Sequence, residues 1–178
     1  MLSNAQKAIA TLAALAALAA CVSQGNQNRE RETKPAIRPQ GLSPFVGTWK
    51  TTGATRATAD APSERIDATD RYEWMEGGFF LLHHVDSRTP YAGKALEIIG
   101  QDTVGDRYRV TGYDSEGRTR TSTYELKGRE LRISAETERL TGAFSNDGET
   151  LNGTWERTKD GLRWLPWKDV TLRKVRTP

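Results

Sequence analysis

The chain has 178 residues, of which 36% are hydrophobic and 28% are charged, with a net charge of +3. This length is typical of one domain. The small net charge and the alternating signs of the charges argue against a nucleic-acid-binding stripe, so we expect no nucleic-acid partner. The chain contains a single cysteine, which excludes an internal disulfide.

The first twenty residues have the pattern of a signal peptide. Ala8 to Leu18 is a run of nearly pure alanine and leucine. It is too short to span a bilayer but has the length of a signal-peptide apolar region. The following LAAC, Leu18 to Cys21, resembles the lipobox of bacterial lipoproteins. That resemblance implies lipidation of Cys21, which would anchor the protein in a membrane. The alternative is an ordinary secretory signal with an incidental cysteine.

The segment after Cys21 is polar and nearly free of large apolar groups, so it is expected to act as a flexible tether. Val22 stands where an Asp would favour retention in the inner membrane. The resemblance therefore implies an outer-membrane lipoprotein in the bacterial cell envelope, facing the periplasm. The predicted organisation is a signal peptide over 1–20, a lipidated Cys and tether over 21–43, and a folded domain over 44–178.

From residue 44 onward hydrophobic residues recur with a period of two. In residues 130–136, for example, Leu131, Ile133 and Ala135 alternate with polar residues. This pattern is typical of strands with one buried face. Turn residues separate the runs and predict ten strands: 45–53, 65–75, 79–87, 93–101, 106–113, 118–126, 130–136, 138–144, 150–158 and 168–175. We expect an all-β domain, closed as an antiparallel up-and-down barrel that leaves no exposed edge.

Four motifs carry a resemblance to a known family. They are GTW at 47–49, YEWMEGGFFL at 72–81, SNDGETLNGTWE at 145–156 and DGLRWLPWKDVTLRK at 160–174. Together they resemble a bacterial family of unknown function with a calycin-like (lipocalin-like) barrel, over about residues 42–176. The resemblance implies the fold but no activity. The stretch at 99–102 departs from the G-Y-D that the family often has there, so no role is carried to it.

Alternation also predicts which side chains face the barrel interior. They are Phe45, Trp49, Ile66, Tyr72, Trp74, Leu96, Ile98, Tyr108, Val110, Tyr124, Leu126, Leu131, Ile133, Leu140, Phe144, Leu151, Trp155, Val170 and Leu172. A barrel of this size is either filled by its side chains or holds one small ligand. The candidates for lining a ligand cavity are Trp49, Tyr72, Trp74, His83, Tyr108, Tyr124 and Trp155.

His83 and His84 are the two histidines of the chain. Neighbouring strand residues face opposite sides, so they cannot bind one ion together. His84 shares its side with Asp86, and we predict that His83 points inward. It is either a core residue bonded to a tyrosine or backbone group, or a haem ligand as in nitrobindin-type barrels, which begin with a similar G-T-W.

The sequence gives little support for a zinc site or for acid–base catalysis. Two histidines are too few for a tetrahedral zinc site, so no metal or other cofactor is expected. Asp67 and Glu73 are predicted to point outward, which leaves no clear carboxylate pair inside for acid–base catalysis. The stretch from Trp164 to Trp167 either caps one end of the barrel or exposes an aromatic pair to a partner or membrane.

These observations favour a binding protein over an enzyme. The predicted function is a lipid-anchored envelope protein whose barrel binds a small apolar or amphipathic ligand. Two alternatives stay open: an accessory surface protein with a filled core, and a haem-binding barrel that uses His83. The oligomeric state and the identity of the ligand do not follow from the sequence.

Overall fold

The structure is a computed structural model that describes residues 39–89, 93–102 and 106–176. The predicted signal peptide, Cys21 and most of the predicted tether lie outside these residues. In the described ranges no helix has both the length and the apolar character needed to cross a membrane.

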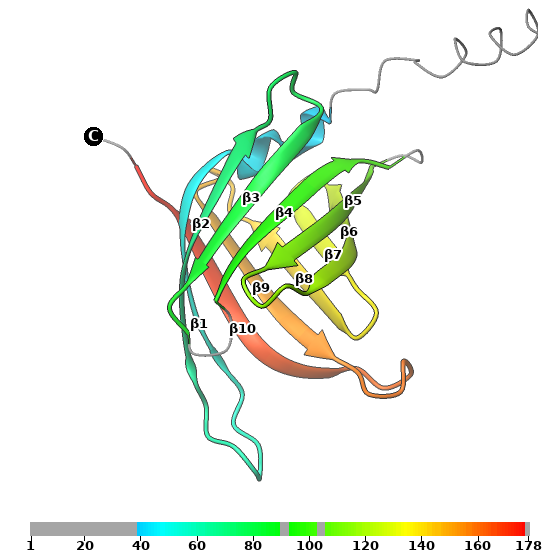
Figure 1. The fold of residues 1–178 in the computed structure, drawn as a ribbon. Coiled ribbons are helices and arrows are strands. Elements are labelled where there is room, and N and C mark those ends of the chain that lie inside the picture. Colours follow the sequence, from blue (N-terminus) through cyan, green and yellow to red (C-terminus); the bar gives the residue numbers. More distant parts are fainter. Residues whose placement is uncertain (1–38, 90–92, 103–105, 177–178) are drawn as a thin grey trace, which may run out of the picture. The chain divides into compact units, whose positions relative to one another are not determined.

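Ten antiparallel strands form one closed barrel (Figure 1). They are β1 (Gly47–Thr55), β2 (Arg65–Trp74), β3 (Phe80–Ser87), β4 (Lys94–Gln101), β5 (Arg107–Asp114), β6 (Thr119–Lys127), β7 (Glu130–Ser134), β8 (Glu138–Phe144), β9 (Thr150–Arg157) and β10 (Leu165–Lys174). Each strand pairs with its neighbours in sequence, and β1 pairs with β10 to close the sheet. The predicted all-β class and up-and-down barrel are confirmed.

The two ends of the barrel differ because strand connections alternate between them. A short 3-10 helix, η1 (Gln40–Phe45), lies at one end, beside the β2–β3 connection (Figure 1). The β1–β2, β5–β6, β7–β8 and β9–β10 connections lie at the opposite end, which we call the mouth. The core is concentrated on the η1 side.

Helix η1 belongs to the barrel core. Leu42 and Phe45 are buried, and the indole Nε1 of Trp49 donates a hydrogen bond of 2.7 Å to the carbonyl oxygen of Phe45. The ring of Phe45 lies 5.3 Å from that of Tyr72 and 5.1 Å from that of Phe144. The packed domain therefore begins by residue 39, earlier than the domain boundary expected between 43 and 44. The reason is that Leu42, in this mostly polar segment, is buried in the core.

Most inward residues are those that alternation predicts, but β4 is a correction. Its inner face carries Ile99, which is fully buried, whereas Leu96 and Ile98 are only partly buried. Ile98 pairs with Leu82, on the side of the sheet opposite to Leu81. Leu96 and Ile98 were expected inside. The expectation is wrong because β4 is apolar on both faces, so hydrophobicity alone does not determine which face turns inward.

Candidate functional site

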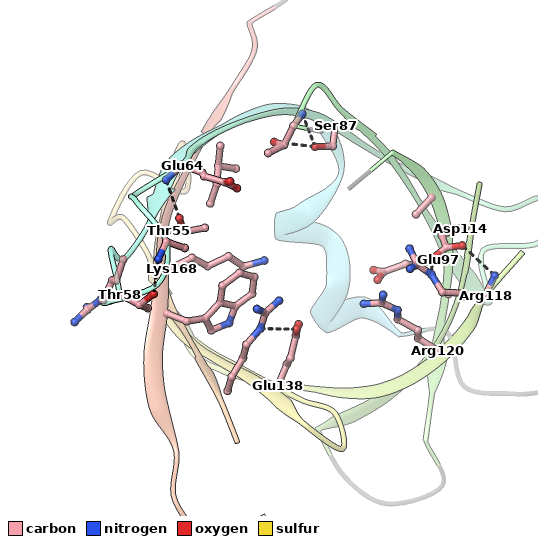
Figure 2. A pocket seen from close by; sticks show the side chains of 18 of the residues that line it. Thr55, Thr58, Glu64, Ser87, Glu97, Asp114, Arg118, Arg120, Glu138 and Lys168 are labelled. Carbon is pink, nitrogen blue, oxygen red and sulfur yellow. Dashed lines mark hydrogen bonds and ion pairs between the residues drawn. The ribbon is translucent and has the colours of Figure 1, made fainter. Parts of the chain in front are cut away.

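A cavity of about 590 Å³ occupies the mouth half of the barrel (Figure 2). Its walls come from strand ends all round the barrel and from the β1–β2 connection. The lining residues include Thr55, Arg56, Thr58, Glu64, Ile66, Ser87, Ala95, Glu97, Asp114, Arg118, Arg120, Glu138, Arg157, Trp167 and Lys168. Volumes of this size are typical of sites for small molecules.

The charges of the lining are unevenly neutralised. Arg157 Nε lies 3.0 Å from a carboxylate oxygen of Glu138, and Arg118 Nε lies 2.7 Å from one of Asp114. Arg120, in contrast, forms no ion pair with any residue that the structure describes. Its guanidinium turns into the cavity toward the side where Lys168 enters (Figure 2). The mouth therefore presents an uncompensated guanidinium to whatever fills it.

Trp167 contributes a second unsatisfied donor. Its indole Nε1 is buried and has no hydrogen-bond acceptor within the described part of the chain. The guanidinium carbon of Arg157 lies 3.1 Å from the centre of the Trp167 ring, so the ring is held in a cation–π contact. A buried donor without a partner costs free energy.

Below the cavity lies a buried network centred on His83. Its Nε2 is 2.9 Å from Asp70 Oδ1, and its Nδ1 is 2.8 Å from Glu97 Oε2. The hydroxyl of Tyr124 donates to the same Glu97 oxygen at 3.0 Å, and that of Thr51 donates to Asp70. The His83 ring stacks on Tyr72 with centroids 3.9 Å apart. Of the carboxylates in this network, Glu97 also lines the cavity, so the network forms part of its floor.

The two carboxylates keep the imidazole protonated. Burial acts to lower the pKa of His83, but the hydrogen bonds and charges of Asp70 and Glu97 outweigh it and raise the pKa to about 9. Burial acts to raise the pKa of Glu97, and the hydrogen bond and charge of His83 lower it overall. Burial, followed by the nearby carboxylates, raises the pKa of the Tyr72 hydroxyl well above its usual range.

This geometry limits what His83 can do. An imidazolium that donates from both nitrogens has no lone pair for a proton or a metal. The haem alternative is therefore not favoured, because iron would have to displace one of two charge-assisted hydrogen bonds. In the described ranges no group of three or more His, Cys, Asp or Glu side chains is arranged to hold a metal ion.

The seven predicted cavity residues divide between core and network. Trp49, Tyr72, Tyr108 and Tyr124 are buried on the η1 side, His83 lies in the network, and Trp74 and Trp155 pack against the core from partly buried positions. None of these seven described residues lines the mouth cavity. Alternation selected the side chains that face inward but not their height along the barrel axis, and height decides which of them meet open space.

Sequence reasoning missed Asp70 and Glu97. Asp70 is on the inner face of β2 with Ala68 and Tyr72, so the alternation itself pointed to it. Glu97 is on the inner face of β4 with Ile99, and the wrong face chosen for that strand concealed it. The expectation that no carboxylate pair lies inside is thus corrected. Asp67 and Glu73 do lie outside, in ion pairs with Lys50 and Arg71.

The Trp164–Trp167 stretch is part of the barrel wall. Strand β10 begins at Leu165, and its register against β9 shifts between Pro166 and Lys168. Trp167 lines the cavity, while the guanidinium carbon of Arg139 lies 4.5 Å from the Trp164 ring centre. The two tryptophans therefore have different environments, neither of which is a lid across the barrel.

Fold and site together define a closed antiparallel barrel with a charged cavity at one end. Residues 34–155 match the model of a family described as a protein of unknown function, DUF1579, and the chain belongs to this family. Barrel and family bear out the resemblance seen in the sequence to that extent. No curated protein sequence matches the chain.

Two solved structures show the same fold. Rv2717c from M. tuberculosis is similar with a TM-score of 0.56 and 15% identity, over 79% of this chain and 99% of that one. A protein of unknown function from the DUF3598 family of Nostoc punctiforme PCC 73102 gives a TM-score of 0.54 at 14% identity. The match covers 80% of this chain but 51% of that protein.

Proposed function

We propose that the barrel binds a small amphipathic molecule whose acidic group enters the mouth cavity. The observation that carries this proposal is the unpaired Arg120 guanidinium, which projects into a cavity of about 590 Å³. Carboxylate, sulfonate and phosphate groups accept charge-assisted hydrogen bonds from a guanidinium.

The rest of the lining supports a ligand that is only partly polar. Ile66, Ala95 and the Trp167 ring supply apolar wall, while Arg157 and Arg118 are neutralised by Glu138 and Asp114. Arg120 is exposed in the empty cavity. A fully apolar ligand would cover its guanidinium without giving it a partner, which is unfavourable. The proposed ligand therefore carries an acidic group and is not a plain hydrocarbon.

The proposal is tested with two fluorescent probes that differ in charge. 8-Anilinonaphthalene-1-sulfonate carries a sulfonate, and N-phenyl-1-naphthylamine has the same ring system without it. We expect the sulfonate to bind at least tenfold more tightly to the purified protein without detergent. Arg120→Gln should remove about 1–2 kcal/mol of that affinity, because a charge-assisted hydrogen bond is lost, and should leave the neutral probe unaffected.

Arg118→Gln is the matched control. Arg118 is also an arginine of the lining, but Asp114 and Glu116 already neutralise it. Its replacement should change sulfonate binding by less than about twofold, since the charge it presents to the cavity is compensated. Equal affinity of wild type and Arg120→Gln for the sulfonate would overturn the proposed function.

The location in the envelope is a further part of the proposal and rests on the sequence. The LAAC stretch supports lipidation of Cys21 and attachment to the outer membrane. Cys21→Ser should leave the protein soluble or as an uncleaved precursor. A processed form of that variant that fractionates with the outer membrane, as the lipidated wild type should, would contradict lipid anchoring without bearing on the cavity.

A further inference from the structure

Lys168 stands apart from the other described lysines. Its side chain enters the cavity from β10 (Figure 2). Among the described lysines it is the one that lines this cavity. Lys50 and Lys94 form ion pairs with Asp67 and Asp86, whereas Lys168, like the three remaining described lysines, forms none with any residue that the structure describes. Its Nζ lies 4.6 Å from the ring centre of Trp155 and 4.4 Å from that of Trp167. An amine without a carboxylate partner thus faces the space where a ligand would sit.

We propose that Lys168 captures the carbonyl group of a ligand as a reversible Schiff base. The inference rests on the proposed function, because the ligand must first occupy the mouth cavity. In this arrangement Lys168 forms the covalent bond to the ligand, and Arg120 binds the acidic group of the ligand. The ligand class is therefore an aldehyde or ketone that also carries a carboxylate or a similar anion.

The chemistry needs no further reactant. The neutral Nζ attacks the carbonyl carbon and forms a C–N bond, and the carbonyl π electrons pass to oxygen, giving a carbinolamine after proton transfer. Loss of water, whose oxygen is that of the carbonyl and whose hydrogens come from the amine, leaves the imine. Glu138 lines the same cavity and offers a carboxylate for relaying protons. Hydrolysis reverses each step, so nothing is oxidised or reduced.

The surroundings favour the neutral amine that this reaction requires. Burial lowers the pKa of Lys168 to about 8, and the charges of Arg157 and Arg120 act in the same direction. The carboxylates of Glu138 and Asp70 act against them and only partly offset the effect. Desolvation and neighbouring cations are recognised means of activating lysine as a nucleophile. Near pH 8 roughly half of the Lys168 side chains would be neutral, against about one in 250 for an ordinary lysine.

The test uses 4-carboxybenzaldehyde with sodium cyanoborohydride, which reduces an imine to a stable secondary amine. The full chain is treated at pH 7.5, followed by intact-mass measurement and peptide mapping. We expect a first adduct at Lys168 that forms at least tenfold faster than at any other lysine. Benzaldehyde, which lacks the carboxylate, should label Lys168 several-fold more slowly. Lys168→Arg should abolish the fast adduct.

Controls separate this inference from the proposed function. Lys159→Arg, at an exposed position outside the cavity lining, should leave the fast phase unchanged. Lys168→Met, checked for an unaltered melting curve, repeats the test without a positive charge. Labelling of lysines in order of their exposure would overturn the Schiff-base proposal, and Arg120-dependent binding of the sulfonate probe in the same sample would leave the proposed function standing. Fast labelling of Lys168 with no Arg120 dependence of sulfonate binding would overturn the proposed function and leave the covalent reactivity of Lys168 standing.

Discussion

The two halves of this barrel are built from the same ten strands but are filled differently. On the η1 side Trp49, Phe45 and Phe144 close the interior, with Trp49 only 1% exposed. On the mouth side arginines, carboxylates and Lys168 surround an open cavity. A single sheet thus surrounds a packed half and an open half along its own axis. The His83 network marks the level at which one half gives way to the other.

The residues of the buried His83 network compensate one another's charge. A carboxylate at this depth needs a compensating charge, and Asp70 and Glu97 share one imidazolium between them. The charge of Asp70 also acts on Lys168 in the cavity. Core and cavity are therefore linked electrostatically as well as through packing.

The largest difference between the halves should appear when a tryptophan is removed from each. Trp49→Ala deletes a fully buried ring and its hydrogen bond to Phe45, so we expect a loss of about 3–5 kcal/mol in the free energy of unfolding. Trp167→Ala at the half-open mouth should cost about 1 kcal/mol, because the ring is only partly buried. Urea unfolding measures both. Similar losses for the two variants would contradict the division into a packed half and an open half.

The His83 network should lose stability when one of its carboxylates is removed. Asp70→Asn leaves His83 with one carboxylate instead of two, and we expect a loss of about 3 kcal/mol, typical of breaking a buried pair. Asp169→Asn is the matched control, since Asp169 pairs with Arg56 in an exposed position. That change should cost no more than about 0.5 kcal/mol. Equal losses for the two variants in urea unfolding would show that the buried network contributes nothing beyond a surface pair.

The free energy of unfolding should also depend on pH, because His83 titrates differently in the folded and unfolded chains. The pKa of His83 is raised from 6.5 to about 9 in the folded state. Its stabilisation is therefore fully present below pH 6.5 and is lost as the pH rises through 9, a difference on the order of 2–3 kcal/mol. The lowered pKa of Lys168 acts in the opposite sense above pH 8. The decisive quantity is the wild-type curve minus that of His83→Gln between pH 6 and 9.5, and a flat difference would contradict a shared imidazolium.

Much of the fold could be predicted from the sequence, because strands with one buried face produce a period of two. All ten expected strands occur within a few residues of their observed bounds, and the burial of Trp49, Tyr72 and Tyr124 follows from that period. Helix η1 escaped prediction. Its one buried leucine and one buried phenylalanine in a six-residue segment make no periodic pattern.

The candidate site was predictable only in part. Alternation indicated an inward His83, yet its carboxylate partners Asp70 and Glu97 come from β2 and β4 and meet it only through the strand register. The sequence does not contain that register, nor the radius that leaves the mouth open. Arg120 and Lys168 have the same alternation as the inward Tyr124 and Val170, so the pattern pointed to them as it did to Asp70. Their charge and their place near strand ends made them resemble ordinary surface residues.

The pairing of β1 with β10 has a consequence for synthesis. Neighbouring strands elsewhere are joined by short connections and can form hairpins as they leave the ribosome, whereas β1 must wait for a partner more than a hundred residues later in the chain. Until then the nascent sheet keeps two open edges, which invite pairing with other chains. The strand that seals it also carries Trp167 and Lys168, so the last strand of the barrel to be translated completes both the barrel and its cavity.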